Sequence, residues 1–103
     1  MENMKHGFTP THPGEVLKDE IEYRKLSQTK LAIQMGISYK ILNDILNERR
    51  PVTTATAMMF EAALGIPAYS LINIQTEYNL HVASRDKSLT ARLAEIRRIT
   101  AIL

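Results

Sequence analysis

Apolar residues recur at spacings of three and four along most of the chain, and glycine, proline and capping residues divide this pattern into short segments. In residues 12–24, Pro13 suits the first position of a helix, and the acidic Glu15 follows in its first turn. The inward face of this helix is expected to comprise Val16, Leu17 and Ile21. No strand-like alternation runs for more than a few residues, so the pattern predicts an all-α fold.

Two further helices are predicted in residues 28–47. Ser27 suits the N-cap of the first, and Gly36 can end it because glycine accepts a left-handed backbone conformation. Ser38 suits the N-cap of the second, which is expected to run to about Asn47. Two helices joined by a short turn that contains glycine form a helix-turn-helix.

The residues around this turn favour a helix-turn-helix over a plain helical hairpin with a solvated outer face. Apolar spacing alone does not separate these two interpretations. However, the small Ala32 stands where the helices would cross closely, and Arg49 and Arg50 follow the second helix directly. The joint core is expected to contain Leu31, Met35, Ile37, Leu42 and Ile45.

Three more segments complete the predicted five or six short helices. Thr53 can cap a helix that ends before Gly65, and Pro67 can open the next one. The first of these helices is expected to face the core with Ala57, Phe60 and Leu64, and the second with Leu71, Ile74 and Tyr78. A final amphipathic helix is predicted from the spacing of Leu89, Leu93, Ile96 and Ile99. The pattern leaves open whether this last helix continues the preceding one or folds back.

The predicted organisation has three parts: a flexible arm at residues 1–11, a helix-turn-helix domain at 12–80 and a C-terminal helical extension at 81–103. A chain of 103 residues suits one domain with a single core.

Polar residues lie on the expected outer face of the second helix of the helix-turn-helix, as a recognition helix requires. Asn can pair with adenine, Lys with guanine, and Asp can accept from the cytosine amino group. The predicted base contacts are Tyr39, Lys40, Asn43, Asp44 and Asn47. Phosphate contacts are expected from residues at the start of the first helix, around the second and at the cap of the next. This predicted set is Gln28, Thr29, Lys30, Ser38, Arg49, Arg50, Thr53 and Thr54.

Charge and composition agree with nucleic-acid binding without proving it. The net charge is only +2, but residues 27–50 carry four basic and two acidic side chains, and residues 81–103 carry five and two. The chain has no cysteine, which excludes disulfides and thiolate chemistry. It has no apolar run typical of a signal peptide or a membrane span, so a cytoplasmic protein is expected.

Candidate catalytic residues and metal ligands are unconvincing. The three histidines His6, His12 and His81 are scattered, and His12 before Pro13 suits helix entry better than metal binding. The carboxylates Asp19, Glu20 and Glu22 are expected on solvated faces of a surface helix, while Ser27 and Ser38 serve as caps. The sequence therefore predicts no enzyme, no metal site and no cofactor.

The chain also resembles a known family. QTKLA, MGIS and ILNDIL resemble the Xre-type, lambda-repressor-like DNA-binding domain. Over about residues 12–80, the chain resembles the HigA, or VapI-like, antitoxins in the segments HPGEVLKDE, LSQTKLA, ILNERRPVTTATA, ALGIP and LINIQTEYNL. HPGE and RRPVT are more specific to this branch than the helix-turn-helix itself.

This resemblance implies a DNA-binding antitoxin of a type II toxin–antitoxin module. Such a protein would neutralise a HigB-like mRNA endonuclease toxin and, as a homodimer, repress its own operon at a palindromic operator in double-stranded DNA. A stand-alone Xre-family repressor without a toxin is the second interpretation. The third is a neutralising module that no longer binds DNA.

Several positions depart from the family pattern. Asp44 stands where a basic residue is common, and Glu48 replaces the glycine of LNGRRP, so both carboxylates are expected to weaken attraction to phosphates. Ser70 and Leu71 replace an aromatic pair typical of the family. The helix after Thr53 has an apolar exterior, which is expected either to form an interface or, as we favour, to be covered by residues 81–103.

Overall fold

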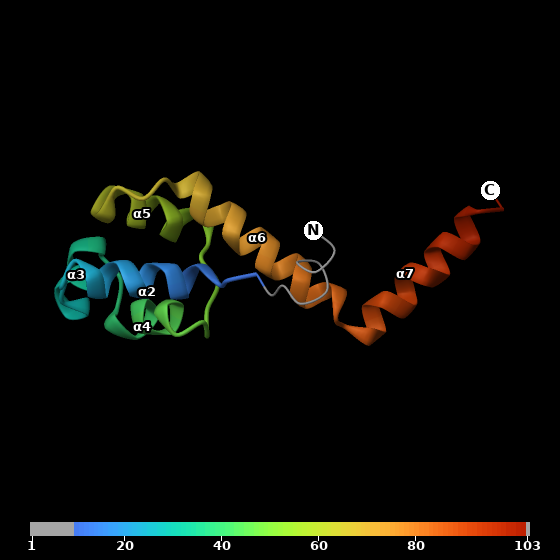
Figure 1. The fold of residues 1–103 in the computed structure, drawn as a ribbon, viewed down its shortest axis with the longest axis horizontal. Helices are drawn as coiled ribbons and strands as arrows, with labels where there is room; N and C mark the ends of the chain where they lie inside the picture. Colours follow the sequence, from blue (N-terminus) through green and yellow to red (C-terminus); the bar gives the residue numbers. More distant parts are fainter. Residues whose placement is uncertain (1–9, 103) are drawn as a thin grey trace.

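A computed structural model describes residues 10–102, and all regular structure in this range is α-helical (Figure 1). The predicted all-α fold is thus confirmed. The six helices of the described chain are α2 (Pro13–Tyr23), α3 (Gln28–Met35), α4 (Tyr39–Leu46), α5 (Thr54–Leu64), α6 (Ala68–Ser84) and α7 (Lys87–Thr100). The arm expected at residues 1–11 lies outside the described residues except for Pro10 and Thr11.

The helices begin and end at the residues that the sequence indicated. The hydroxyls of Ser27, Ser38 and Thr53 accept hydrogen bonds from backbone N–H groups in the first turns of α3, α4 and α5. Gly36 and Gly65 end α3 and α5 with φ of 74° and 77°, the left-handed region that glycine enters at little cost. Local capping chemistry therefore sets the lengths of these short helices.

One core lies between helices α2 to α6. Its fully buried members are Leu17, Ile21, Leu42, Ile45, Leu46, Ala57, Phe60 and Leu71, with Leu31, Ala32, Met35, Val52 and Leu64 almost as buried. Every residue expected in the joint core of the helix-turn-helix is buried there, except that Ile37 is half-buried at its edge. The prediction for Val16 is wrong: this side chain is 37% exposed, because the inward stripe of α2 is formed by Leu17 and Ile21.

Helix α2 enters the core through a close approach that the sequence did not reveal. His12 caps the helix, since its Nδ1 accepts a hydrogen bond of 2.8 Å from the Gly14 N–H. A β-carbon on Gly14 would stand 2.0 Å from the carbonyl oxygen of Ile45 in α4. The absence of a side chain at Gly14 thus allows the backbones of α2 and α4 to approach each other.

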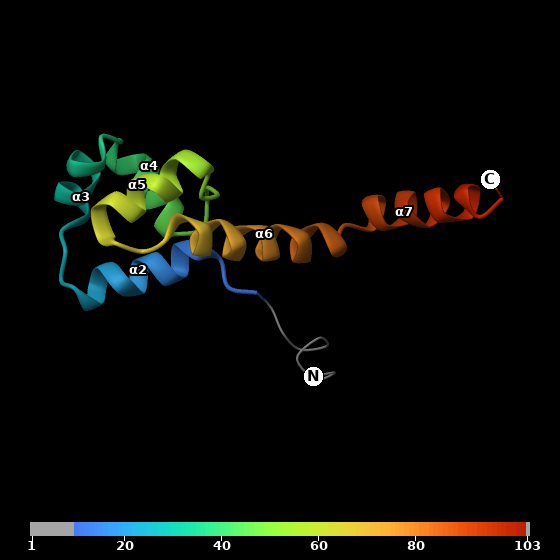
Figure 2. The same ribbon diagram turned by 90° about the horizontal axis from the view of Figure 1, so that it is seen from above.

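The C-terminal extension leaves the core and does not return to it. Helix α6 runs past residue 80, and Asp86 caps α7, which extends away from α5 (Figures 1 and 2). No described residue of α7 is buried. The interpretation that residues 81–103 cover the outside of the helix after Thr53 is therefore wrong: α6 is straight enough and long enough to carry α7 beyond reach of that surface.

Candidate nucleic-acid interface

Helices α3 and α4 form the predicted helix-turn-helix, joined by Gly36, Ile37 and Ser38. Ala32 is buried at the crossing, as expected from its small side chain. The apolar side of α4 enters the core through Leu42, Ile45 and Leu46. The opposite side of α4 is therefore held in place from beneath and faces outward.

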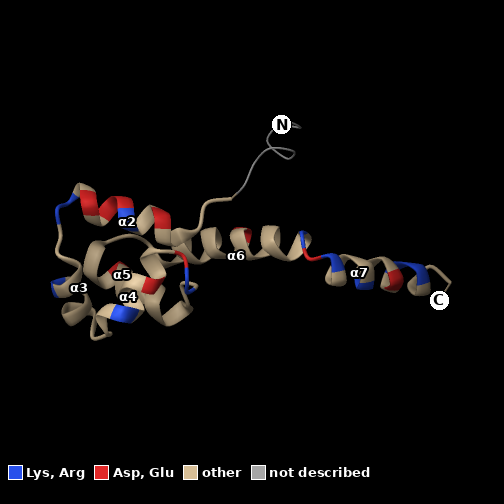
Figure 3. Cartoon of the chain, turned by 90° about the horizontal axis from the view of Figure 1, so that it is seen from below, with Lys and Arg blue, Asp and Glu red and all other residues tan. Residues whose placement is uncertain are grey.

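The outer face of α4 carries most of the predicted base-contacting residues. Tyr39 is exposed and the Lys40 side chain is 81% exposed, while Asn43 and Asn47 are half-buried. Figure 3 shows acidic residues gathered on α2, whereas α3 carries Lys30 and α4 carries Lys40 together with Asp44. A DNA phosphate approaching α4 would therefore meet fewer carboxylates than one approaching α2.

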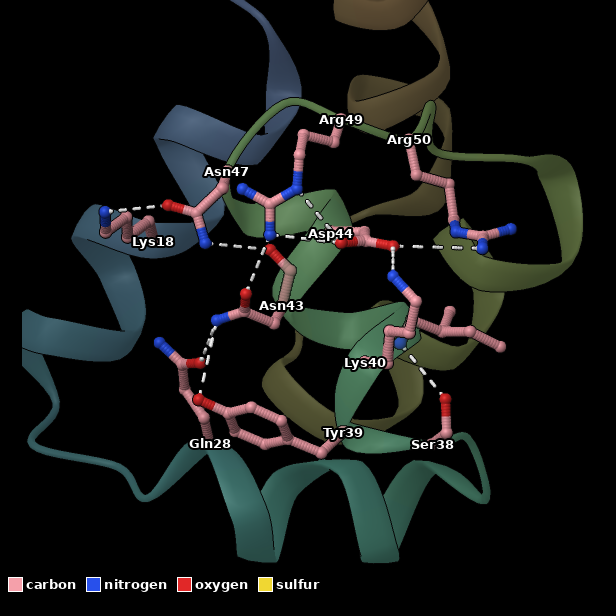
Figure 4. A network of polar contacts seen from close by, with 11 residues as sticks. Lys18, Gln28, Ser38, Tyr39, Lys40, Asn43, Asp44, Asn47, Arg49 and Arg50 are labelled. Atoms are coloured by element: carbon pink, nitrogen blue, oxygen red, sulfur yellow. Dashed lines mark hydrogen bonds and ion pairs between the residues drawn. The ribbon is translucent and has the colours of Figure 1, made fainter.

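The position of Asp44 corrects the sequence-based expectation that it lies on the outside of this helix. Its side chain is only 11% exposed and lies among three cations, which are drawn in Figure 4. Lys40 Nζ donates to Oδ2 at 3.1 Å and Arg49 Nε donates to Oδ1 at 3.1 Å, while Arg50 Nη2 lies 4.0 Å from Oδ2. The hydrogen bond from Lys40, followed by that from Arg49, holds the pKa of Asp44 below its usual range despite the opposing effect of burial.

Asn43 lies at the centre of a second set of contacts. Its Oδ1 accepts a hydrogen bond of 2.9 Å from Arg49 Nη2, and its Nδ2 donates to Gln28 Oε1 at 3.3 Å. The Tyr39 hydroxyl lies 3.5 Å from the same nitrogen, a long contact that an incoming base could replace. Gln28 from α3, Tyr39 from α4 and Arg49 from the following turn therefore meet at this amide (Figure 4).

Asn47 is tied to α2 as well as to α4. Its Nδ2 donates to the carbonyl oxygen of Asn43 at 2.9 Å, and its Oδ1 accepts from Lys18 Nζ at 3.2 Å. Lys18 was not among the predicted residues. It is 29 positions away in the chain, and only the packing of α2 against α4 brings it to the site. No local pattern in the sequence could have indicated it.

The predicted phosphate contacts lie around this face and differ in exposure and in hydrogen bonding. Thr29, Lys30 and Thr54 are exposed, and Gln28 is hydrogen-bonded to Asn43. The hydroxyls of Ser38 and Thr53 accept hydrogen bonds from backbone N–H groups and so cap the helices that follow. Arg49 and Arg50 share the Asp44 carboxylate, so their positions are less free than the sequence suggested.

Comparison with known proteins places the chain in a family. No family model matches it. Virulence-associated protein I of Dichelobacter nodosus is 36% identical over 84 residues, which cover 81% of this chain and 78% of that protein. An addiction module antidote protein of the HigA family from Coxiella burnetii superposes with a TM-score of 0.72 at 28% identity, over 81% of this chain and 91% of that one. The chain belongs to the HigA (VapI-like) family of antitoxins.

A further HigA structure is relevant to the surface around α4. The antitoxin HigA of Pseudomonas aeruginosa, solved with the higBA promoter, superposes with a TM-score of 0.66 at 29% identity. The match covers 91% of this chain and 95% of the Pseudomonas protein, so it includes the helix-turn-helix.

The turn after α4 explains why glycine suits the family pattern at position 48. Glu48 has φ of 65°, and its N–H donates to the carbonyl of Ile45 while that of Arg49 donates to the carbonyl of Asp44. These two hydrogen bonds define a Schellman motif, in which the residue at the position of Glu48 takes a left-handed conformation. This HigA protein therefore carries the cost of a β-carbon where glycine would have none.

The exterior of α5 forms part of an apolar groove with α3. Gln34, Met35, Met59, Ala62 and Ala63 line this groove, whose volume is about 400 Å³. Gln34 has the one polar side chain among these five lining residues, and none of the five belongs to the predicted DNA-contacting set. The groove therefore shares no lining residue with the predicted DNA-binding surface.

Among residues 10–102, no helix has the length and apolar character needed to span a bilayer.

Proposed function

We propose that this HigA-family protein binds operator DNA through α4, represses its own operon and neutralises a HigB-like mRNA endonuclease toxin. Its role is regulatory, without catalysis, and the cytoplasm, where its operator would lie, is the proposed location. The observation that carries the DNA-binding part is the outer face of α4, where the Lys40 side chain is exposed although paired with Asp44, and Asn43 is held in a defined orientation. Family membership carries the antitoxin part.

In this proposal, α4 lies in the major groove. Lys40 would donate to guanine, and Asn43 would pair with adenine, with Tyr39 and Asn47 contacting neighbouring base edges. Lys30, Thr29 and Thr54 would bind phosphates on either side and so fix the register of α4 on the duplex. The solved HigA complex with its promoter, which matches most of this chain, supports this arrangement.

A homodimer on a palindromic operator is the proposed assembly. Two recognition helices about 34 Å apart would reach half-sites one helical turn apart. The exposed stripe of α7, formed by Leu89, Leu93, Ile96 and Ile99, supports association, because apolar side chains at this spacing gain stability only when another surface covers them.

The DNA-binding part is tested by comparing two variants on a duplex selected by the wild-type protein from a random pool and on a scrambled duplex. Asn43→Ala should lose about 1–3 kcal/mol on the selected duplex only. Lys30→Ala should weaken binding to both duplexes equally and lower the salt slope by about one. Equal losses on both duplexes for Asn43→Ala would contradict the placement of this residue against a base.

The antitoxin part is tested by inducing the small reading frame next to this gene in a host cell, with and without the protein. Growth arrest that this protein relieves, with both chains co-purifying, would support the proposal. The double variant Lys40→Ala/Asn43→Ala should still relieve the arrest, because DNA contacts and toxin binding are expected to be separable. Absence of arrest and of a complex would leave a stand-alone repressor.

A further inference from the structure

We propose that Asp44 is a positioning residue whose buried carboxylate fixes the amide of Asn43 through Arg49, so that this negative charge increases sequence-specific DNA binding. The proposal rests on the DNA-binding function proposed above. It reverses the simple electrostatic expectation, in which a carboxylate close to DNA phosphates weakens binding.

The link between the two side chains is a single guanidinium group. Arg49 donates from Nε to Asp44 Oδ1 at 3.1 Å and from Nη2 to Asn43 Oδ1 at 2.9 Å, as Figure 4 shows. Nη2 itself also lies 3.0 Å from Asp44 Oδ1, so the edge formed by Nε and Nη2 rests on this oxygen. Because the guanidinium group is planar and rigid, holding this edge on Asp44 sets where Nη2 lies beside Asn43. The carboxylate therefore acts on Asn43 without touching it.

The backbone reinforces this link. Asp44 and Arg49 are the two ends of the Schellman motif after α4, joined by the hydrogen bond of 2.8 Å from the Arg49 N–H to the Asp44 carbonyl. An apolar contact commonly joins these two positions. Here an ion pair takes its place, and the turn itself brings the partners together.

The resulting orientation of Asn43 suits adenine. An Asn amide has two donor hydrogens and an oxygen with two lone pairs. Arg49 uses one lone pair and Gln28 uses one hydrogen, while the second hydrogen faces the Tyr39 hydroxyl at 3.5 Å. Replacing this long contact with Tyr39 gives the amide one acceptor and one donor for the adenine N6–H₂ and N7. A reversed amide would place its NH₂ group against the donors of Arg49, so the network selects the orientation that can read the base.

Glu48 provides a matched control for charge. It is exposed, follows the same helix and makes no ion pair with any residue of the described chain, whereas Asp44 is buried among Lys40, Arg49 and Arg50. Neutralising either carboxylate changes the net charge by the same amount. Only Asp44 is connected to Asn43.

The test measures binding of the full-length variants Asp44→Asn and Glu48→Gln to the selected and scrambled duplexes defined above. Asp44→Asn should bind the selected duplex about tenfold more weakly, with scrambled DNA bound equally or more tightly, because a misplaced Asn43 loses most of one bidentate base contact. Glu48→Gln should bind both duplexes equally or more tightly and keep their affinity ratio.

Two further variants separate positioning from a general structural effect. In the Asn43→Ala background, Asp44→Asn should cause no additional loss of the affinity ratio. Arg49→Lys keeps the charge but cannot donate as a planar fork, so it should lower the ratio about as much as Asp44→Asn. Thermal unfolding followed by circular dichroism checks that each variant is folded.

The outcomes are distinguishable. If Asp44→Asn tightens binding to both duplexes as Glu48→Gln does, or if its loss persists in the Asn43→Ala background, the positioning role is wrong while DNA binding stands. A wild-type protein that selects no sequence overturns the DNA-binding function and this proposal with it.

Discussion

Helices α4 and α7 are both amphipathic, yet the chain uses them in opposite ways. α4 buries Leu42, Ile45 and Leu46 among the other helices, and its polar face is bound into a network with neighbouring elements. α7 is longer, with apolar residues at similar spacing, but it buries none of them in the described chain (Figure 2). An ion pair on α7 joins the exposed side chains of Arg98 and Glu95 and adds little stability.

The difference shows what a helical pattern does and does not determine. Apolar spacing predicts that a helix has a face to cover, whereas the covering surface depends on contacts distant in sequence. An isolated helix of 14 residues is only marginally stable in water. α7 therefore depends on a further surface far more than α4 does, consistent with the proposed association of two copies.

The largest expected difference between the two helices comes from the same substitution in each. Leu42 in α4 is fully buried, whereas Leu93 in α7 is 37% exposed. Leu42→Ala should lower the free energy of unfolding by about 3 kcal/mol through lost burial and the cavity left behind. Leu93→Ala should change it by about 0.5 kcal/mol or less at protein concentrations low enough to keep the chain monomeric. Urea denaturation measures both values.

Protein concentration makes this comparison sharper. If two copies associate through α7, the effect of Leu93→Ala should grow as the concentration rises, while that of Leu42→Ala should stay nearly constant. A cost for Leu93→Ala as large as that for Leu42→Ala in the dilute monomer would mean that α7 packs onto the core after all.

A second substitution tests how tightly α2 packs against α4. Gly14→Ala places a β-carbon where the Ile45 carbonyl oxygen lies, so α2 must move away from α4. The expected loss is about 2 kcal/mol, within the usual range for overpacking, measured from urea midpoints. Gly36→Ala is the control, because open space surrounds that position and only its positive φ opposes a side chain.

For Gly36→Ala the expected loss is about 1 kcal/mol, the cost of a left-handed conformation alone. If Gly14→Ala lowered the free energy of unfolding no more than Gly36→Ala does, α2 and α4 would separate easily. The contrast between the packed helices α2 to α6 and the uncovered α7 would then be weaker.

Local chemistry explains which parts of this structure the sequence could predict. Ser27, Ser38, Thr53 and Gly36 act on their own neighbours, so each helix end was readable from a few residues. The role of Gly14 was not readable, because its backbone is ordinarily helical and its constraint comes from a carbonyl 31 positions away.

The candidate site was predictable to a similar degree. Helical spacing correctly grouped Lys40, Asn43 and Asn47 on one face of α4. It also placed Asp44 on that face, but spacing alone does not show that the side chains of Lys40, Arg49 and Arg50 cover the carboxylate. Arg49 reaches it only through the left-handed turn at Glu48. Burial of a charge depends on its partners, and these became clear only from the tertiary structure.

The smallest expected effect concerns the place where the packed region meets α6. His12 caps α2 and its ring stands edge-on to Tyr78 of α6, with centroids 4.8 Å apart. Burial lowers the pKa of His12 below its ordinary value near 6.5, and the nearby charge of Glu48 only partly opposes this. Protonation of Nδ1 would also remove the acceptor for the Gly14 N–H.

Because the unfolded chain then binds a proton more readily than the folded one, this contribution to stability is complete above about pH 6.5 and is lost as the pH falls through the lowered pKa. Urea midpoints measured from pH 8 to pH 5 should therefore decline at the acidic end. His12→Asn keeps a capping oxygen without a titrating ring, so its midpoints should decline less over the same range. If the urea midpoints of the two proteins declined in parallel, titration of His12 would not be the cause. The contact between α2 and α6 would then not depend on pH. The lowered pKa of Asp44 confines its own titration to more acidic conditions, so the two groups can be told apart by the pH range alone.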